Sequence, residues 1–168
     1  MARAQSDRRE TLVWKIADLV RAYQREVDQL DDAACAYLGI NRTDARCLDT
    51  IHQLGPLSPS ALAREAGLPA SSMTTVLDRL ERRGFARRMR DKSDRRRVLV
   101  EMTAHGRKRT MKVYGPLATD TRRRFAPYDE RQLEFLRDFF NAERDWVARW
   151  IARVREMDVP RKREQRKA

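Results

Sequence analysis

The densest basic segment of this chain directly follows a stretch of short hydroxyl side chains. From Arg79 to Arg97, ten arginines and lysines stand against three acidic residues, so this segment carries a net +7. Arginine-rich loops suit the narrow, electronegative minor groove of DNA. Short hydroxyl side chains can reach base edges or phosphates in the major groove without steric cost. Together these residue types predict binding to a duplex, and the hydroxyl residues concerned are Ser71, Ser72, Thr74 and Thr75.

The elements that must position these side chains are three short helices and a hairpin. Apolar spacing and the Gly and Pro residues between segments predict helices at Asn41–Leu54, Ser58–Ala66 and Ala70–Arg83. The last two helices, joined by a Gly-Leu-Pro turn, form a helix-turn-helix pattern. The apolar period then changes to two over Phe85–Met102, which predicts a β-hairpin around a polar loop. The expected fold class is therefore mainly α with a small β-hairpin.

Two longer amphipathic helices flank this centre. One is expected from Arg8 to about Tyr37 and the other from Asp129 to about Met157, with a helix that begins at Thr103 and kinks at Gly115-Pro116 between them. We expect their apolar seams to form a dimerisation surface, although the seams could also pack on each other within one subunit. The seam residues are Leu12, Ile16, Leu19, Tyr23, Leu133, Leu136, Phe140, Val147 and Trp150.

Composition and motifs argue against several other classes of protein. The 168 residues carry a net +12, which favours a polyanionic partner, and no apolar run is long enough to cross a bilayer. The N-terminus lacks the apolar core of a secretion signal, and two cysteines fit a reducing cytoplasm. We find no phosphate loop, no Cys/His cluster with metal-ligand spacing and no nucleophile elbow. We therefore expect no enzymatic activity, no metal and no cofactor.

These motifs together resemble the MarR (multiple antibiotic resistance regulator) family of winged-helix transcription factors. The matching segments are Leu62–Leu68, Ser72–Phe85, Asp94–Val100 and Thr103–Gly106. The resemblance implies a homodimer with interleaved terminal helices, in which each winged helix-turn-helix enters one half-site of a near-palindromic operator. It implies dimerisation parts at residues 1–38 and 104–160, a DNA-binding domain at 39–103 and a location on a bacterial or archaeal nucleoid in the cytoplasm. Residues 161–168 are expected to be a disordered basic tail.

The resemblance also implies roles for individual residues. Asp94 and Arg96 match the family's Asp-x-Arg pair in the wing, with Arg96 in the minor groove and Asp94 steadying it. The chain departs from many relatives, which carry Arg where it has Thr75. The other implied DNA contacts are phosphate contacts by Arg95 and Arg97 and phosphate binding at the helix start that holds Ser58 and Ser60. Arg79 of the recognition helix is expected to contact DNA, or alternatively to pair with neighbours on the side of Glu81.

The regulation implied by the resemblance is repression that a small aromatic or anionic ligand releases. Trp14, Lys15, Tyr37, His52 and Tyr114 are the candidate pocket residues, and each also fits an ordinary core or surface position. An activator and a redox-responsive regulator are alternatives within the family, although the two cysteines also fit small core residues. A basic architectural or RNA-binding protein is an alternative of another class, but it would need exposed aromatic residues for base stacking. Here the aromatic residues fall on the helical seams.

Overall fold

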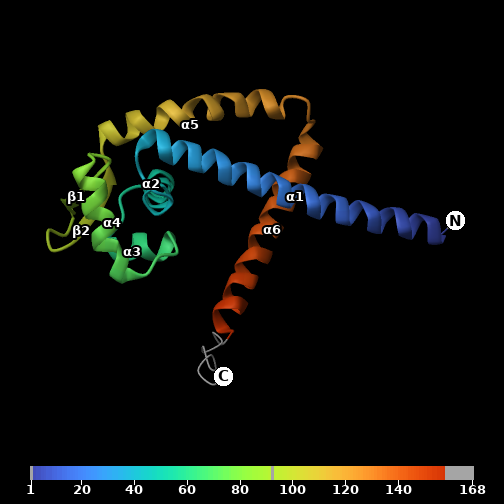
Figure 1. Cartoon of the computed structure of the whole chain (residues 1–168), viewed down its shortest axis with the longest axis horizontal. Helices are drawn as coiled ribbons and strands as arrows, with labels where there is room; N and C mark the ends of the chain where they lie inside the picture. The colour runs from blue at the N-terminus through green and yellow to red at the C-terminus, as the bar shows by residue number, and fades with distance from the viewer. Residues whose placement is uncertain (1, 92, 158–168) are drawn as a thin grey trace, which may run out of the picture. The chain divides into compact units, whose positions relative to one another are not determined.

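The computed structural model describes residues 2–91 and 93–157, and the predicted basic tail at 161–168 lies outside them. Over these residues the chain forms helices and one antiparallel hairpin (Figure 1), which confirms the expected fold class. Two compact units, residues 1–116 and 117–168, divide the chain, and their boundary falls within α5 directly after Pro116. The elements are α1 (Ala2–Leu38), α2 (Arg42–Leu54), α3 (Pro59–Glu65), α4 (Ala70–Arg82), β1 (Ala86–Arg90), β2 (Val98–Met102), α5 (Ala104–Phe125) and α6 (Glu130–Glu156).

Side chains predicted to begin helices do so in the structure. Asn41 Oδ1 accepts a hydrogen bond from the backbone N–H of Asp44 at 2.9 Å, and Ser58 Oγ accepts one from Ala61 at 3.2 Å. Asp129 and Gln132 form a complete capping box at the start of α6. These caps satisfy N–H groups that have no partner within the helix, so they fix where α2, α3 and α6 begin.

The hydrophobic core of the first unit lies between the short helices and the hairpin. Strands β1 and β2 pair so that Ala86 lies opposite Met102 and Arg90 opposite Val98. The last turns of α1 add Cys35 and Leu38 to this core. Because α4 and the hairpin share one core, the predicted recognition helix and the wing are held in a defined arrangement. The largest fully buried apolar side chains are Phe85, Leu62, Leu77, Leu80 and Val100.

The start of α5 is locked to the end of α4 by the Thr-x-x-Gly segment. Thr103 Oγ1 accepts a hydrogen bond from the Gly106 N–H at 2.9 Å, and the Thr103 N–H donates to the Phe85 carbonyl at 3.0 Å. A Cβ atom at Gly106 would collide with the backbone of Phe85. Glycine is therefore required at this position for close packing, and the helix after the wing is set against the core.

The predicted seams of α1 and α6 are largely exposed. Leu19 is 69 % exposed and Phe140 is 55 % exposed, while Leu136 is half-buried. None of the α6 residues is buried. Large exposed apolar patches of this kind mark protein–protein or membrane interaction sites or ligand grooves. No helix among the described residues is long and apolar enough to span a membrane.

Candidate nucleic-acid interface

Helix α4 buries one face and turns its hydroxyl side chains toward solvent. Met73, Val76, Leu77 and Leu80 are buried. In contrast, Ser71, Thr74 and Thr75 are exposed, and Ser72 is half-buried. The face predicted to read base edges is thus free of intramolecular packing. Whether these hydroxyl groups contact DNA stays a prediction.

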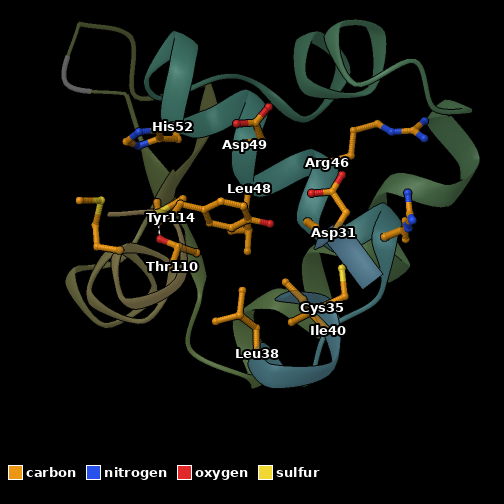
Figure 2. A pocket seen from close by; sticks show the side chains of 14 residues that line it. Asp31, Cys35, Leu38, Ile40, Arg46, Leu48, Asp49, His52, Thr110 and Tyr114 are labelled. Atoms are coloured by element: carbon orange, nitrogen blue, oxygen red, sulfur yellow. Dashed lines mark hydrogen bonds between the residues drawn. The ribbon is translucent and has the colours of Figure 1, made fainter. Parts of the chain in front are cut away.

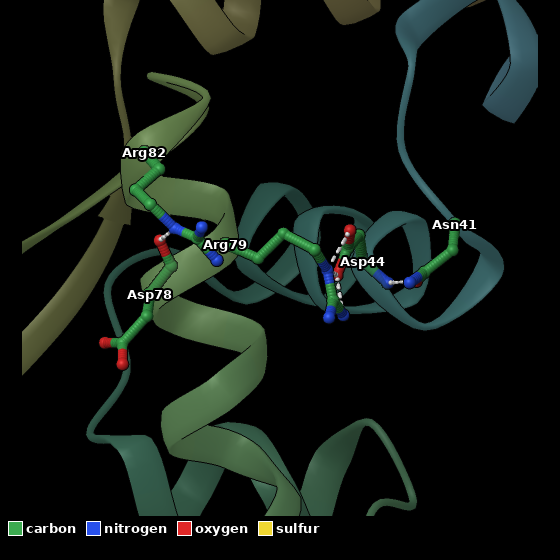
Figure 3. A network of polar contacts seen from close by, with 5 residues as sticks. All are labelled: Asn41, Asp44, Asp78, Arg79 and Arg82. Carbon is green, nitrogen blue, oxygen red and sulfur yellow. Dashed lines mark hydrogen bonds and ion pairs between the residues drawn. The ribbon is translucent and has the colours of Figure 1, made fainter.

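Arg79 has a partner that the sequence did not suggest. Its Nε lies 2.8 and 2.9 Å from the two carboxylate oxygens of Asp44, and its Nη2 lies 2.6 Å from Oδ1 (Figure 3). Asp44 is completely buried. This hydrogen bonding raises the pKa of Arg79, so the guanidinium stays charged. The pair ties α4 to α2 and gives Arg79 a positioning role. Whether Arg79 also contacts DNA stays a prediction.

Asp44 is the residue that sequence reasoning missed. It lies in the first turn of α2, where a carboxylate favours the positive helix start, but its side chain is in the core. It occupies the same helical stripe as the buried Leu48 and Ile51, at spacings of four and three residues. A carboxylate on an apolar stripe requires a buried cation, because an unpaired charge in the core is costly. In the sequence, this spacing is the signal that could have identified Asp44 as a buried, paired carboxylate.

Two further arginines are neutralised at the base of the hairpin. Arg88 Nη2 lies 2.8 Å from Asp78 Oδ1, and its Nη1 contacts Glu81. Glu81 also accepts the backbone N–H of Arg88 at 2.6 Å, which joins the end of α4 to β1. Arg87 pairs across the hairpin with Glu101. Part of the positive charge of the basic segment is therefore paired with acidic residues, and these pairs hold α4 and the hairpin together.

The wing loop presents arginines of a different kind. Arg95, Arg96 and Arg97 are exposed, and the described part of the chain gives them no ion pair. Asp94 Oδ1 accepts the backbone N–H of Arg96 at 3.0 Å, and the Asp94 carbonyl accepts that of Arg97 at 2.9 Å. Asp94 thus steadies the backbone of Arg96, whereas we expected it to hold the guanidinium.

A second aspartate organises the other side of the same loop. Asp91 Oδ1 accepts both the backbone N–H of Ser93 at 2.8 Å and its hydroxyl at 2.7 Å. These hydrogen bonds lower the pKa of Asp91, so the carboxylate stays ionised and keeps accepting them. The described residues of the wing loop thus form hydrogen-bonded turns and expose three adjacent guanidinium groups.

The predicted phosphate site at the start of α3 is occupied by a local cap. The Ser58 hydroxyl accepts the N–H of Ala61, and it lies 3.2 Å from the hydroxyl of Ser60. Helix α3 has only seven residues. Phosphate binding by Ser58 and Ser60 stays a prediction.

A cavity of about 440 Å³ lies within the first unit. His52 and Tyr114 line it, as expected, whereas Trp14, Lys15 and Tyr37 do not. Only the last turns of α1 reach the cavity, through the stripe that contains Asp31, Cys35 and Leu38. Trp14 and Lys15 lie several turns earlier on exposed parts of α1, and Tyr37 is 62 % exposed on another face of the helix. These three residues therefore lie outside this cavity, and a role for them in a ligand pocket stays a prediction.

Both cysteines are buried free thiols. Cys35 is 5 % exposed and Cys47 is inaccessible. Burial raises the pKa of Cys35, and it raises that of Cys47 to about 11. Because the thiolate is the reactive form, both groups are poorly suited to sensing oxidants.

Comparison with known proteins agrees with this architecture. The sequence model of the MarR family matches residues 40–98. An HTH-type transcriptional regulator of Bacillus subtilis, YcgE, is 30 % identical over 124 residues, which cover 74 % of this chain and 80 % of YcgE.

Two solved structures share the fold. The transcriptional regulator PA4135, known from a crystal structure, shares 27 % sequence identity with this chain. The two structures match with a TM-score of 0.55 over 76 % of this chain and 94 % of PA4135. A point mutant of S. aureus MepR, solved bound to an oligodeoxyribonucleotide, has a TM-score of 0.53 at 20 % identity, over 78 % and 96 % of the two chains. From the family match, the YcgE relationship and the winged-helix geometry, we conclude that this chain belongs to the MarR family of DNA-binding transcriptional regulators.

Proposed function

We propose that the protein is a repressor that binds a pseudo-palindromic operator as a homodimer on the cytoplasmic nucleoid. The observation that carries this proposal is the wing loop, where Arg95, Arg96 and Arg97 are exposed and form no ion pair with any described residue, on a backbone held by Asp94. In the proposed complex, Arg96 enters the minor groove while the exposed hydroxyl face of α4 lies in the major groove. Arg95 and Arg97 contact phosphates on either side.

The dimer is proposed from the exposed seams of α1 and α6. Side chains such as Leu12, Tyr23 and Trp150 are between 42 and 58 % exposed, although each would gain stability from burial. A second copy of the chain supplies a matching apolar surface. Two-fold symmetry of the protein then explains why the operator is expected to be a pseudo-palindrome.

Release by a small ligand is proposed from the position of the cavity. Its walls come from α1 and α5, which carry or adjoin the seams, and from α2, which supports α4 through the Asp44–Arg79 pair. A ligand that binds one arrangement of these helices better than another shifts the population toward it. Occupancy of the cavity can thereby change the spacing of two recognition helices in a dimer.

A footprint of the full-length protein on genomic DNA, followed by mobility-shift titration of the recovered sites, tests the proposal. We expect pseudo-palindromic sites, a dimer in sedimentation, and an affinity that falls steeply with salt because several phosphates are neutralised. A reporter gene behind the recovered site should be silenced, and increased expression would support the activator alternative. Uniform DNA coverage or preference for RNA would favour the architectural or RNA-binding alternative, and a flat salt dependence would count against a DNA partner.

A further inference from the structure

Two carboxylates at the cavity form no ion pair with any described residue. Asp31 of α1 and Asp49 of α2 both line the cavity that contains Tyr114 (Figure 2). Among the described residues, Asp31 accepts no hydrogen bond and forms no ion pair. Asp49 accepts a hydrogen bond at 2.8 Å from the neutral side-chain amide of Gln53. Both negative charges are therefore uncompensated at the cavity wall.

The arginines at the cavity do not neutralise these carboxylates. Arg42 donates from Nη1 to Asp28 at 2.7 Å and from Nε to Asp32 at 2.6 Å, so two other carboxylates already share its single charge. Arg46 is directed away from the Tyr114 ring in Figure 2, and its Nη1 lies 3.5 Å from the carbonyl of Ala66.

The lining itself carries equal numbers of formal charges, Asp31 and Asp49 against Arg42 and Arg46. Because Arg42 is paired with Asp28 and Asp32, which do not line the cavity, the four carboxylates and two guanidinium groups together leave a net −2. Arg109 of α5 lies nearby, but it contacts the Leu38 carbonyl and the ring of Phe85 and does not line the cavity. The two lining carboxylates thus have no cation of their own among the described residues, and Asp31 is half-buried whereas Asp49 is exposed.

The rest of the wall suits an aromatic or aliphatic body. Apolar side chains from all contributing elements surround Tyr114, and the sulfur atoms of Met102 and Met111 can adapt to different shapes. Burial raises the pKa of the Tyr114 hydroxyl, and the charges of Asp31, Cys35 and Asp49 raise it further. The phenol therefore stays neutral, and its ring face can attract a cation. The remaining apolar residues of the wall are Leu38, Ile40, Ala45 and Leu48.

We infer that this cavity binds a lipophilic organic cation, such as an aromatic ammonium, in preference to an aromatic anion. The body of the ligand lies against Tyr114 and the methionines, and its ammonium group lies between Asp31 and Asp49. The volume of about 440 Å³ falls in the range of small-molecule sites. The regulatory meaning of this inference rests on the proposed function, and it replaces the anionic effector with a cationic one.

Calorimetric titration of the full-length protein with three matched probes tests the charge preference. Naphthylmethylammonium, naphthylmethanol and naphthoate share one bicyclic body and differ in charge. We expect the ammonium to bind at least about tenfold more tightly than the carboxylate, because each unpaired aspartate attracts one and repels the other. The alcohol should fall between them.

Single substitutions assign the preference to the two aspartates. Asp31→Asn and Asp49→Asn should each weaken ammonium binding several-fold while the affinity for naphthylmethanol is kept. Asp18→Asn is the matched control, since Asp18 is an exposed carboxylate elsewhere on α1 and should leave all three affinities unchanged. Unfolding curves of the three variants verify that each retains its fold.

Three outcomes would overturn the inference: naphthoate binding as tightly as the ammonium, Asn variants that keep the charge preference, or no binding of any probe. A mobility-shift assay of the same preparation on its footprinted site separates this failure from failure of the proposed function. If the protein binds its DNA site but does not prefer the ammonium probe, only the inference of a cationic ligand is contradicted. Absence of site-specific DNA binding contradicts the proposed function, whatever the probes do.

Discussion

The arginines of α4 and β1 differ from those of the wing loop in what they contact. Arg79 forms a bidentate pair with the fully buried Asp44, and Arg88 bridges Asp78 and Glu81. Arg95 and Arg96 belong to the same basic segment, yet they are exposed and have no acidic partner among the described residues. The first group holds the recognition helix and the base of the hairpin, and the second is available to DNA.

This difference teaches that a run of like charge in a sequence can contain two functions. The net +7 of the segment suggested one DNA footprint, but three of its arginines pair with acids from α2, α4 and β2. The acids inside the wing behave differently again, because Asp91 and Asp94 accept hydrogen bonds from backbone N–H groups and, among the described residues, form no ion pair with a guanidinium group. Burial and partner geometry, more than charge density, separate positioning residues from binding residues.

The largest expected effect comes from removing the buried pair at α4. Arg79→Met leaves Asp44 charged in the core without its partner, so the free energy of unfolding should fall by about 3–5 kcal/mol. Denaturant titration followed by circular dichroism measures this loss. The site-specific DNA affinity measured on the fraction that remains folded should also fall, because α4 loses its link to α2.

A double variant shows whether the loss arises from the stranded charge. Asp44→Leu combined with Arg79→Met replaces the pair by apolar side chains and should recover most of the stability. Arg82→Met is the matched control on the same helix, since Arg82 is exposed and donates to a backbone carbonyl at 3.3 Å. A loss for Arg79→Met no greater than that for Arg82→Met would contradict a positioning role for Arg79.

The next effect concerns the wing and should change binding without changing stability. Arg96→Ala should weaken binding to the footprinted operator by about 1–3 kcal/mol with the dimer intact. Arg87→Ala removes another exposed arginine, which pairs with Glu101, and it should have a smaller effect. Mobility-shift titrations at one fixed salt concentration compare the two variants. An unchanged operator affinity for Arg96→Ala would remove the wing assignment.

A smaller effect with an informative sign is expected at Asp94. Substitution by alanine removes a negative charge near DNA, which by electrostatics alone would strengthen binding. It also removes the acceptor for the Arg96 backbone N–H, and losing this hydrogen bond should destabilise the loop conformation by about 1 kcal/mol. We expect the net result to be weaker binding by fluorescence anisotropy. Stronger binding of Asp94→Ala would show that loop order does not limit the wing.

Local signals predicted most of the fold. The caps at Asn41, Ser58 and Asp129 and the glycine at position 67, where φ is +64°, depend on a few neighbouring residues. The predicted helix at Ala70–Arg83 therefore agrees with α4 to within one residue. The alternation that follows Phe85 likewise located β1 and β2.

Contacts between distant residues were beyond local patterns. Asp44 and Arg79 are 35 residues apart, and their pairing depends on how α2 packs against α4. The failure of Trp14 and Lys15 to line the cavity has the same origin, because only packing decides which turns of α1 reach α2. For the wing, the adjacent Asp and Arg residues identified the loop, but the atom that Asp94 binds required coordinates.

The smallest expected effect is that of peroxide on the two cysteines, which lie in the buried core and not in the exposed wing. Both cysteines lie in the core that supports α4, and burial raises the pKa of Cys47 to about 11. At neutral pH each thiol is therefore less ionised than an exposed cysteine, so peroxide should leave operator affinity unchanged in mobility-shift assays. Thiol titration should detect Cys35 and Cys47 only after denaturation. A loss of affinity that a thiol reductant restores would show that the core opens under native conditions, and it would support the redox-responsive alternative.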